Sequence, residues 1–268
     1  MDISSLNLGH DYADLIGRIG TGRPFITFEQ ARFGVPGVLL RHDIDISLVL
    51  SHRMALIENS LGVRATYFVM VSSEFYNPAE AAQIRLLRGL VDLGHEIGLH
   101  FDGSTYGFSN NFDLGRAIDA EAKWLENLVG GEVRAVSFHN PSLTGSTPDH
   151  EVYSGLTNAY GRSIMEAYEY WTDSAGRWTK KYESQSEEQS TNLQLLIHPE
   201  WWFASEKSNL RRVLEAVIGR ANSTLLSHID RVLESSGAYG NLRSTQIRDD
   251  SGREEDQVAL LRKILRRI

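Results

Sequence analysis

The stretch GVLLRHDID, residues 37–45, is an apolar run that ends in charged side chains. Such a run is typical of a buried strand, which we predict at 37–43, and it places the charged residues at the strand's carboxyl end. Side chains alternate along a strand, so Asp43 and Asp45 face one way while His42 faces the other. Two carboxylates on one side indicate a metal ligand beside a general base. They are also consistent with a turn followed by a helix N-cap at Asp45 or Ser47.

The same alternation of apolar runs and amphipathic stretches continues beyond this strand. We predict further strands at 65–71, 96–101, 135–139, 156–162, 166–172 and 193–198. We predict helices at 48–61, 79–93 and 112–129, two of them ending at the capping glycines Gly62 and Gly94. Strands that alternate with helices predict an α/β protein with about seven parallel strands in a sheet or barrel.

Polar residues gather directly after four of these strands, at 41–45, 100–102, 139–141 and 198–200. The carboxyl ends of parallel strands meet at one edge of a sheet or barrel, where active sites are built. Each histidine taken alone is as consistent with an ordinary packed residue. Their joint placement after separate strands favours a metal or acid–base site.

The remaining histidines and a tryptophan pair fall outside this pattern. His95 begins its strand and is expected at the opposite, structural end of the fold, so we do not predict it as a ligand. We interpret four others as surface or packing residues: His10, His52, His150 and His228. Trp201 and Trp202 either stack on a sugar ring beside the site or pack in the core.

Composition limits the chemistry and the partners. The chain of 268 residues has no cysteine, so any metal must be held by His, Asp or Glu. A net charge of -8 argues against a general nucleic-acid surface, and a small or glycan-like substrate fits better. The sequence contains no signal-peptide pattern and no apolar run long enough for a membrane span, which predicts a soluble, cytoplasmic protein.

We predict a boundary near residue 240, with a barrel at 1–240 and a linker followed by a basic amphipathic helix at 241–268. Residues 173–191 are polar and predict a surface excursion, while 205–235 predict one or two helices that close the barrel domain. The last helix, 254–268, carries an apolar stripe together with four basic residues: Arg262, Lys263, Arg266 and Arg267. It either rests on an anionic membrane surface or packs on the barrel or on another subunit of an oligomer.

Four motifs together resemble the polysaccharide deacetylase family. They are RHDID at 41–45, ATYFV at 65–69, GHEIGLH at 94–100 and LLIHP at 195–199. In that family the corresponding motifs are an HDxD or DD segment, an ATFFV-like strand, GHEIGxH, and a late strand ending in His. The run DSAGRW at 173–178 is similar to the branch associated with surface-polysaccharide and O-antigen biosynthesis.

The resemblance implies a distorted (β/α) barrel and a divalent metal, usually zinc, bound by one Asp and two His. By position, Asp43 matches the catalytic base, Asp45 the metal-binding Asp, and His100 the first metal His. His198 matches the general acid, and Asp173 the Asp that orients it. The implied activity is removal of an acyl group, typically N-acetyl, from an amino sugar.

One departure from the family concerns the second metal His, which lies four residues after the first. Here that position is Ser104, so either Asp102 or His139 completes the ligand set, or the metal site is weakened or lost. We predict His139, because it ends the next strand, where the family has an Arg-x-Pro motif. Two alternatives remain open: another metal-dependent barrel amidohydrolase, for example one acting on a cyclic amide, and a carbohydrate-binding relative that has lost catalysis.

Overall fold

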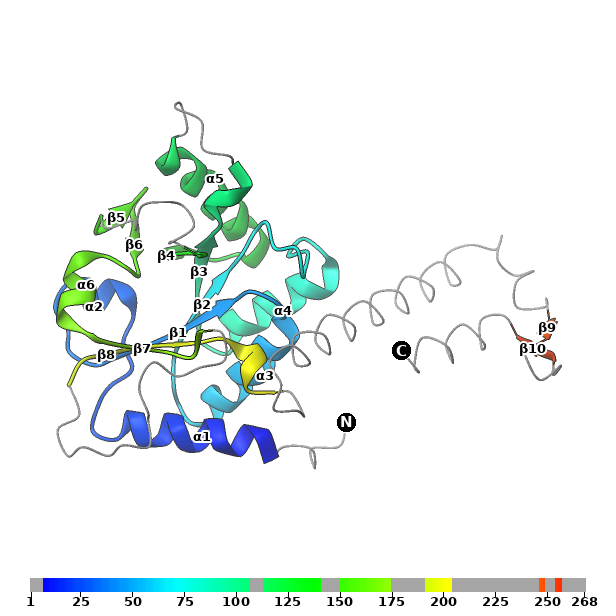
Figure 1. The fold of residues 1–268 in the computed structure, drawn as a ribbon, viewed down its shortest axis with the longest axis horizontal. Coiled ribbons are helices and arrows are strands. Elements are labelled where there is room, and N and C mark those ends of the chain that lie inside the picture. Colours follow the sequence, from blue (N-terminus) through cyan, green and yellow to red (C-terminus); the bar gives the residue numbers. More distant parts are fainter. Residues whose placement is uncertain are drawn as a thin grey trace. The chain divides into compact units, whose positions relative to one another are not determined.

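The computed structural model describes residues 7–106, 113–140, 150–174, 191–203, 246–248 and 254–256 (Figure 1). The chain separates into two compact units, Met1–Arg212 and Val213–Ile268. The boundary expected near residue 240, the polar excursion and the helices expected at 205–235 fall largely outside the described residues and stay predictions. Among the described helices, none has the length and apolar character needed to cross a membrane.

An eight-stranded sheet forms the first unit, in the order β5-β6-β4-β3-β2-β1-β8-β7. Its strands are β1 Val38–Ile44, β2 Thr66–Val69, β3 Glu96–Phe101, β4 Val133–Phe138, β5 Val152–Tyr153, β6 Leu156–Asn158, β7 Glu169–Thr172 and β8 Leu193–Ile197. Neighbouring strands pair in parallel, except for β5 and β6, which are antiparallel. The predicted α/β class is confirmed, and the short strand β5 is the eighth.

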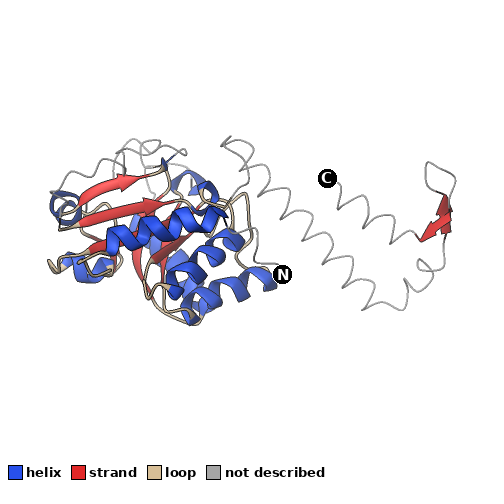
Figure 2. Cartoon of the chain, turned by 90° about the horizontal axis from the view of Figure 1, so that it is seen from below, coloured by secondary structure: helices blue, strands red, loops and turns tan. Residues whose placement is uncertain are grey.

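The longer helices pack on the outside of this sheet, whereas the two short helices at 28–32 and 162–167 contribute side chains to its inner face (Figure 2). The helices are α1 Asn7–Gly20, α2 Phe28–Arg32, α3 Leu48–Ser60, α4 Ala81–Asp92, α5 Leu114–Val129 and α6 Arg162–Ala167, with 3-10 turns η2 Gly103–Tyr106 and η5 Pro199–Trp201. The three predicted helices are confirmed as α3, α4 and α5. Ser47 is the N-cap of α3, because its Oγ accepts a hydrogen bond from the N–H of Leu50.

Two predicted strands were too long. The segments expected at 156–162 and 166–172 shorten to β6 and β7, because α6 occupies the residues between them. A turn closes directly after β6, where the N–H of Gly161 donates to the carbonyl of Asn158 at 2.9 Å. The six-residue helix that follows is too short to give a clear helical period in the sequence.

The sheet curls into a distorted barrel. Ser137 of β4 lies 3.5 Å from Asp43 of β1, measured from Oγ to Oδ1. Three strand spacings separate these strands, about 14 Å in a flat sheet, so the sheet must bend to bring them together. The guanidinium of Arg41 lies 4.5 Å from the ring of Tyr160, which follows β6, and Tyr160 is hydrogen-bonded to Tyr170 of β7. The two edges of the sheet therefore approach each other.

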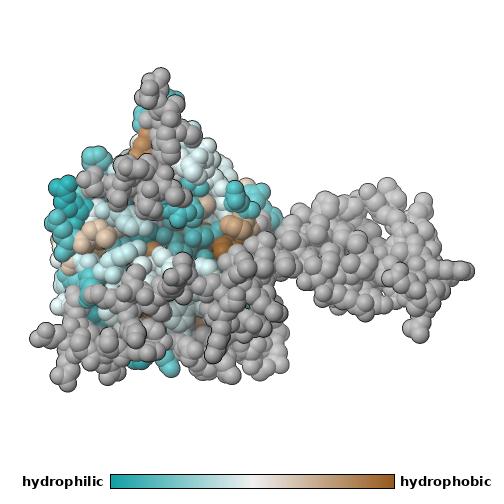
Figure 3. Space-filling view, in the orientation of Figure 1, coloured by the Kyte–Doolittle hydropathy of each residue, from teal (hydrophilic) through white to brown (hydrophobic). Residues whose placement is uncertain are grey.

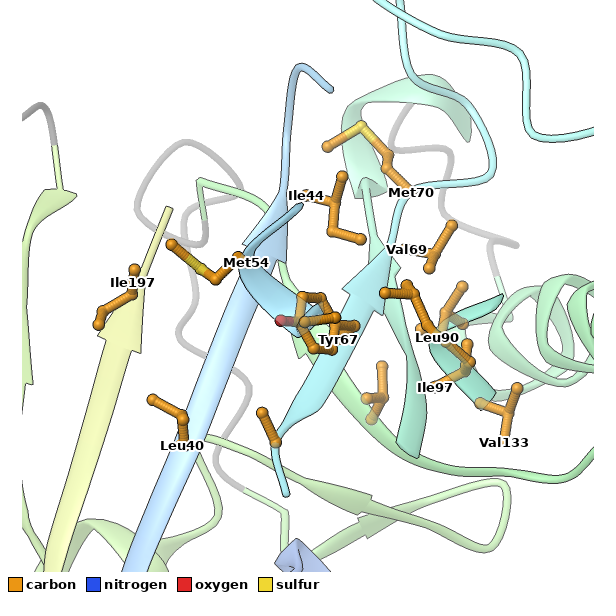
Figure 4. Packing of buried hydrophobic residues seen from close by; sticks show 14 of the residues in the cluster. Leu40, Ile44, Met54, Tyr67, Val69, Met70, Leu90, Ile97, Val133 and Ile197 are labelled. Atoms are coloured by element: carbon orange, nitrogen blue, oxygen red, sulfur yellow. The ribbon is translucent and has the colours of Figure 1, made fainter. Parts of the chain in front are cut away.

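Alternation along each strand separates an outer core from the barrel interior. Leu40 and Ile44 of β1 point outward into a cluster that includes Met54 of α3 and Leu90 of α4 (Figure 4). The interior has its own apolar cluster, composed of Phe28, Ala31, Leu39, Phe68, Ala135, Ala159, Ile164 and Tyr168. With these side chains buried, hydrophilic residues predominate on the described surface in Figure 3. The inner cluster fills the amino end of the barrel and leaves the carboxyl end to the polar residues.

Gly98 of β3 faces the interior against Phe68. A Cβ at this position would lie 2.5 Å from the ring of Phe68, which is fully buried. We expect Gly98→Ala to lower the free energy of unfolding by about 1–3 kcal/mol, the usual effect of overpacking a core. Gly17→Ala, at an exposed site in α1 with nothing within 4 Å, is the matched control and should leave stability unchanged or slightly higher. Urea unfolding of both variants measures the difference, and equal stabilities would contradict the packing argument.

The second unit contains an antiparallel pair, β9 Gln246–Arg248 and β10 Glu254–Asp256. The expectation of an irregular linker up to residue 253 and a helix from 254 was wrong at these six residues. The register places Arg248 opposite Glu254. The sequence between the two strands, DDSGR at residues 249–253, is rich in residue types that favour turns. The rest of the predicted helix, with its basic residues, lies outside the described residues.

Candidate metal centre

Asp45, His100 and His139 converge at the carboxyl ends of β1, β3 and β4. One ligand atom from each lies within 4.8 Å of the other two. His100 Nε2 is 3.3 Å from Asp45 Oδ1, and His139 Nδ1 is 3.6 Å from the same oxygen. The two imidazole nitrogens are 3.3 Å apart. Two nitrogens and one carboxylate oxygen that face one another form a donor set suited to zinc.

The carboxylate of Asp45 fits a bound cation. Its Oδ1 atom is buried and has no hydrogen-bond partner among the described residues. Burial raises the pKa of Asp45, but the adjacent imidazoles of His100 and His139 outweigh this effect and hold the pKa well below its usual value. Because a buried, ionised oxygen without a donor is costly, its position between two imidazoles suits a divalent ion.

Neighbouring side chains orient both imidazoles. The hydroxyl of Ser137 lies 2.7 Å from Nδ1 of His100, so Nε2 faces the centre. The amide of Asn140 lies 2.7 Å from Nε2 of His139, so Nδ1 faces the centre. Such contacts fix the ring orientation and the tautomer of metal-binding histidines. Ser137 was not predicted, although it lies on the interior side of β4, two residues before His139.

Substitution can test which residue completes the ligand set. Asp102 is not part of the converging group, and its Oδ1 accepts a hydrogen bond from the N–H of Ser104 at 2.9 Å. We expect His139→Ala to lose most of the bound metal, and Asp102→Ala to keep it. Metal content after dialysis, measured by mass spectrometry, checks this. Metal lost with Asp102→Ala but kept with His139→Ala would overturn the assignment.

Asp43 lies beside the centre and is paired with a buried arginine. Arg41 donates to both carboxylate oxygens, from Nε at 2.8 Å and from Nη2 at 2.7 Å. Arg41 is fully buried, with its guanidinium over the rings of Phe68 and Tyr160. Burial raises the pKa of Asp43, but the charge of Arg41 outweighs it, so the pKa lies below its usual value. Asp43 Oδ2 is 3.7 Å from His100 Nε2, which places an ionised carboxylate against the ligand group.

His198 and Asp173 form a second pair at the same edge. Nδ1 of His198 lies 2.8 Å from Asp173 Oδ1, and Nε2 lies 3.9 Å from Asp45 Oδ2. Trp202 donates to Asp173 Oδ2 at 3.0 Å and packs edge-on against Tyr12. Burial lowers the pKa of His198, but the hydrogen bond and charge of Asp173 outweigh this and raise it to about 10. The imidazole is therefore protonated near pH 7, with one nitrogen held by Asp173 and the other directed to the centre.

Glu200 is a further buried carboxyl that we did not predict as a site residue, although it lies in the polar segment after the last barrel strand. It is 2% exposed, and Oε2 has no hydrogen-bond partner among the described residues. Burial and the charge of Asp45 raise the pKa of Glu200 to about 8. It is therefore mainly uncharged at neutral pH.

His42 and His95 lie outside the centre, on the helix side of the sheet. His42 Nε2 is 2.6 Å from Glu58 of α3, and His95 Nδ1 is 3.6 Å from the same carboxylate. Tyr12 and Tyr67 also donate to Glu58. Glu58 is fully buried, and this network joins α1 and α3 to the outside of the sheet.

Fold and site together define an α/β barrel with an Asp–His–His group at the carboxyl ends of its strands. No model of a known family matches the sequence, and no curated protein matches it either. The structure is similar to a family 4 carbohydrate esterase from Bacillus anthracis, with 16% identity, a TM-score of 0.39, and coverage of 80% of this chain and 86% of that chain.

Two further solved structures are similar. One is a CE4 family pseudoenzyme from Bacillus anthracis, with 16% identity and a TM-score of 0.37, matched over 70% of this chain and 60% of that chain. The other is the chitin deacetylase from the fungal pathogen Colletotrichum lindemuthianum, with 14% identity and a TM-score of 0.39, matched over 68% of this chain and 81% of that chain. The chain thus spans less than two thirds of the length of the pseudoenzyme.

Proposed function

We propose that this protein is a metal-dependent hydrolase that removes an N-acetyl group from an amino sugar. The observation that carries the proposal is the placement of Asp43 and His198 within 4 Å of the Asp45–His100–His139 group. Asp43 Oδ2 lies 3.7 Å from His100 Nε2, and His198 Nε2 lies 3.9 Å from Asp45 Oδ2. An ionised carboxylate and a protonated imidazole beside one ligand group provide the base and the acid that amide hydrolysis requires.

Each residue then has a definite task. Asp45, His100 and His139 would hold a divalent ion, which when bound would lower the pKa of a water and polarise the amide carbonyl. Asp43 is placed to accept the proton of the attacking water, and Arg41 keeps the accepting oxygens in a fixed plane through its two hydrogen bonds. His198 donates a proton from Nε2 to the departing amine nitrogen. Asp173 holds Nδ1 of His198 and stabilises its charged form.

The proposal extends to the metal and to the substrate class. Zinc is supported by the mixed nitrogen and oxygen donor set. An amino sugar of a surface polysaccharide, such as an O-antigen, is supported by the sequence motifs and by the run at 173–178. A catalytically inactive relative is not favoured, because the candidate ligands, base and acid all lie together. Cytoplasmic localisation and membrane contact by the last helix stay predictions from the sequence.

Acetate release tests the proposed function. The full-length protein, loaded with zinc, is incubated with N-acetylhexosamine oligosaccharides, and acetate is measured by an enzyme-coupled assay. We expect release that stops on addition of a chelator and returns when zinc is restored. A cyclic amide offered in parallel tests the amidohydrolase alternative. Stoichiometric zinc binding without acetate release from any acylated sugar would overturn the proposal.

A further inference from the structure

A pocket of about 430 Å³ opens directly beside the candidate metal centre. Its volume lies in the range of small-molecule sites. It includes two of the candidate ligands, Asp45 and His139, and its other lining residues are Met70, Ser72, Glu74, Phe75, Asp102, Ser104, Thr105 and Asn140. A sugar whose acyl group reaches the metal would therefore lie against these side chains.

Most of the pocket wall is formed by the connections that follow β2 and β3. Hydrogen bonds join the connection after β2 to the backbone of Asp45. Ser73 Oγ donates to the backbone carbonyl of Asp45 at 3.2 Å, and the N–H of Phe75 donates to Ser73 Oγ at 3.1 Å. These bonds fix the backbone on both sides of Glu74. On the opposite wall, Thr105 Oγ1 donates to Ser72 Oγ at 3.1 Å. The connection after β3 is thereby joined to the connection after β2.

Apart from His139, a candidate metal ligand, the ionisable residues of the described lining are all acidic. Asp45, Glu74 and Asp102 are acidic, and the described lining contains no lysine or arginine. Three carboxylates more than cancel the two charges of a divalent ion at the centre. The two nearby cations are already paired with carboxylates, the guanidinium of Arg41 with Asp43 and the protonated imidazole of His198 with Asp173. The hydroxyls of Ser72, Ser104 and Thr105 suit the uncharged hydroxyls of a sugar.

We propose that this pocket selects neutral or positively charged sugars and discriminates against sugars that carry phosphate or carboxylate at the bound residue. This inference rests on the proposed function, because it identifies the sugar class that the same centre acts on. An anionic group beside Glu74 and Asp102 meets like charges in a partly enclosed site, which opposes its binding. A free amine on a neighbouring sugar, left by earlier deacetylation, meets opposite charge and is favoured.

Binding measurements separate charge selection from catalysis. The zinc-loaded wild-type protein, in which Arg41 stays paired with Asp43, is titrated by calorimetry with an N-acetylhexosamine disaccharide whose amides are replaced by ketones so that it is not hydrolysed. The titration is repeated with the same analogue phosphorylated at the 6-position. We expect the neutral sugar to bind about tenfold more tightly at low ionic strength, and the difference to shrink at 0.5 M NaCl as the charges are screened. In a wild-type background that carries Glu74→Gln and Asp102→Asn, the preference should fall to about twofold or less.

The matched control is Asp92→Asn in the same background, since Asp92 is exposed at the end of α4, ahead of the amino end of β3. It should leave the preference unchanged. Equal or tighter binding of the phosphorylated sugar overturns the inference, as does failure to bind either sugar. Acetate released equally well by the wild-type protein from the N-acetyl forms of both sugars overturns the pocket's selectivity and leaves the proposed function intact. A binding preference for the neutral sugar, without acetate release from either sugar, supports the pocket's selectivity and overturns the proposed function.

Discussion

Replacing Asp43 with asparagine is expected to leave the bound metal in place and to lower kcat by about 10²–10⁴-fold. Asparagine has nearly the same shape as aspartate, but its amide cannot take the proton of the attacking water. Asp43 is not in the converging ligand group, so the metal content should stay near that of the wild type. Steady-state acetate release and metal analysis on the same preparation measure both effects.

The buried arginine requires a folding control for this variant. Asparagine leaves the guanidinium of Arg41, fully buried, without its carboxylate partner, and this lowers stability. Circular dichroism and urea unfolding show whether the variant is folded under assay conditions. Asp92→Asn makes the same chemical change at an exposed site and should keep full activity. A folded, metal-loaded Asp43→Asn protein with near wild-type kcat would remove Asp43 from the role of base.

Asp45→Ala and His100→Ala are each expected to abolish both metal binding and activity. Either change leaves two protein ligands, and catalytic zinc sites ordinarily require three. Wild-type protein should show a rise in Tm on addition of zinc, because a ligand that binds only the folded state stabilises it. The two variants should show no such rise. Thermal unfolding with and without zinc, combined with metal analysis, tests this.

His52→Ala is the matched control for these two variants, because it removes an imidazole that lies away from the centre. His52 lies in α3, where its ring is close to Gly89 of α4. This variant should keep the zinc-dependent rise in Tm. Stoichiometric metal retained by Asp45→Ala or His100→Ala would falsify the assignment of ligands.

Much of the barrel was predictable because its strands are continuous apolar runs that are followed directly by charged or polar residues. β3 was predicted with both ends correct, and β1 and β8 to within one residue at each end. α1 was not predicted, although it is fourteen residues long, and neither was the two-residue strand β5. Strand pairs as short as β5 and β6 are fixed by tertiary contacts rather than by a local period, so the sequence carries little sign of them.

The same reasoning explains what was predictable about the site. Alternation placed Asp43 and Asp45 on one side of β1, and strand polarity placed His100, His139 and His198 at one edge. The same alternation places Arg41 on the side of Asp43, yet its role appeared only when the surrounding rings were seen to bury it. Ser137 gave no signal, because a serine within a strand has many ordinary roles and its partner lies on another strand.

The candidate ligands lie at strand ends, whereas most of the pocket residues lie on connections, and this separation has an evolutionary consequence. The three candidate ligands and the base occupy the ends of β1, β3 and β4, so their spacing is inherited from the register of the sheet. The side chains that a substrate would meet belong to the connections after β2 and β3, which run over the surface and tolerate insertion and drift. If the proposed function holds, changes in those connections would alter the preferred substrate, while the ligand group and the base would keep their positions on the strands.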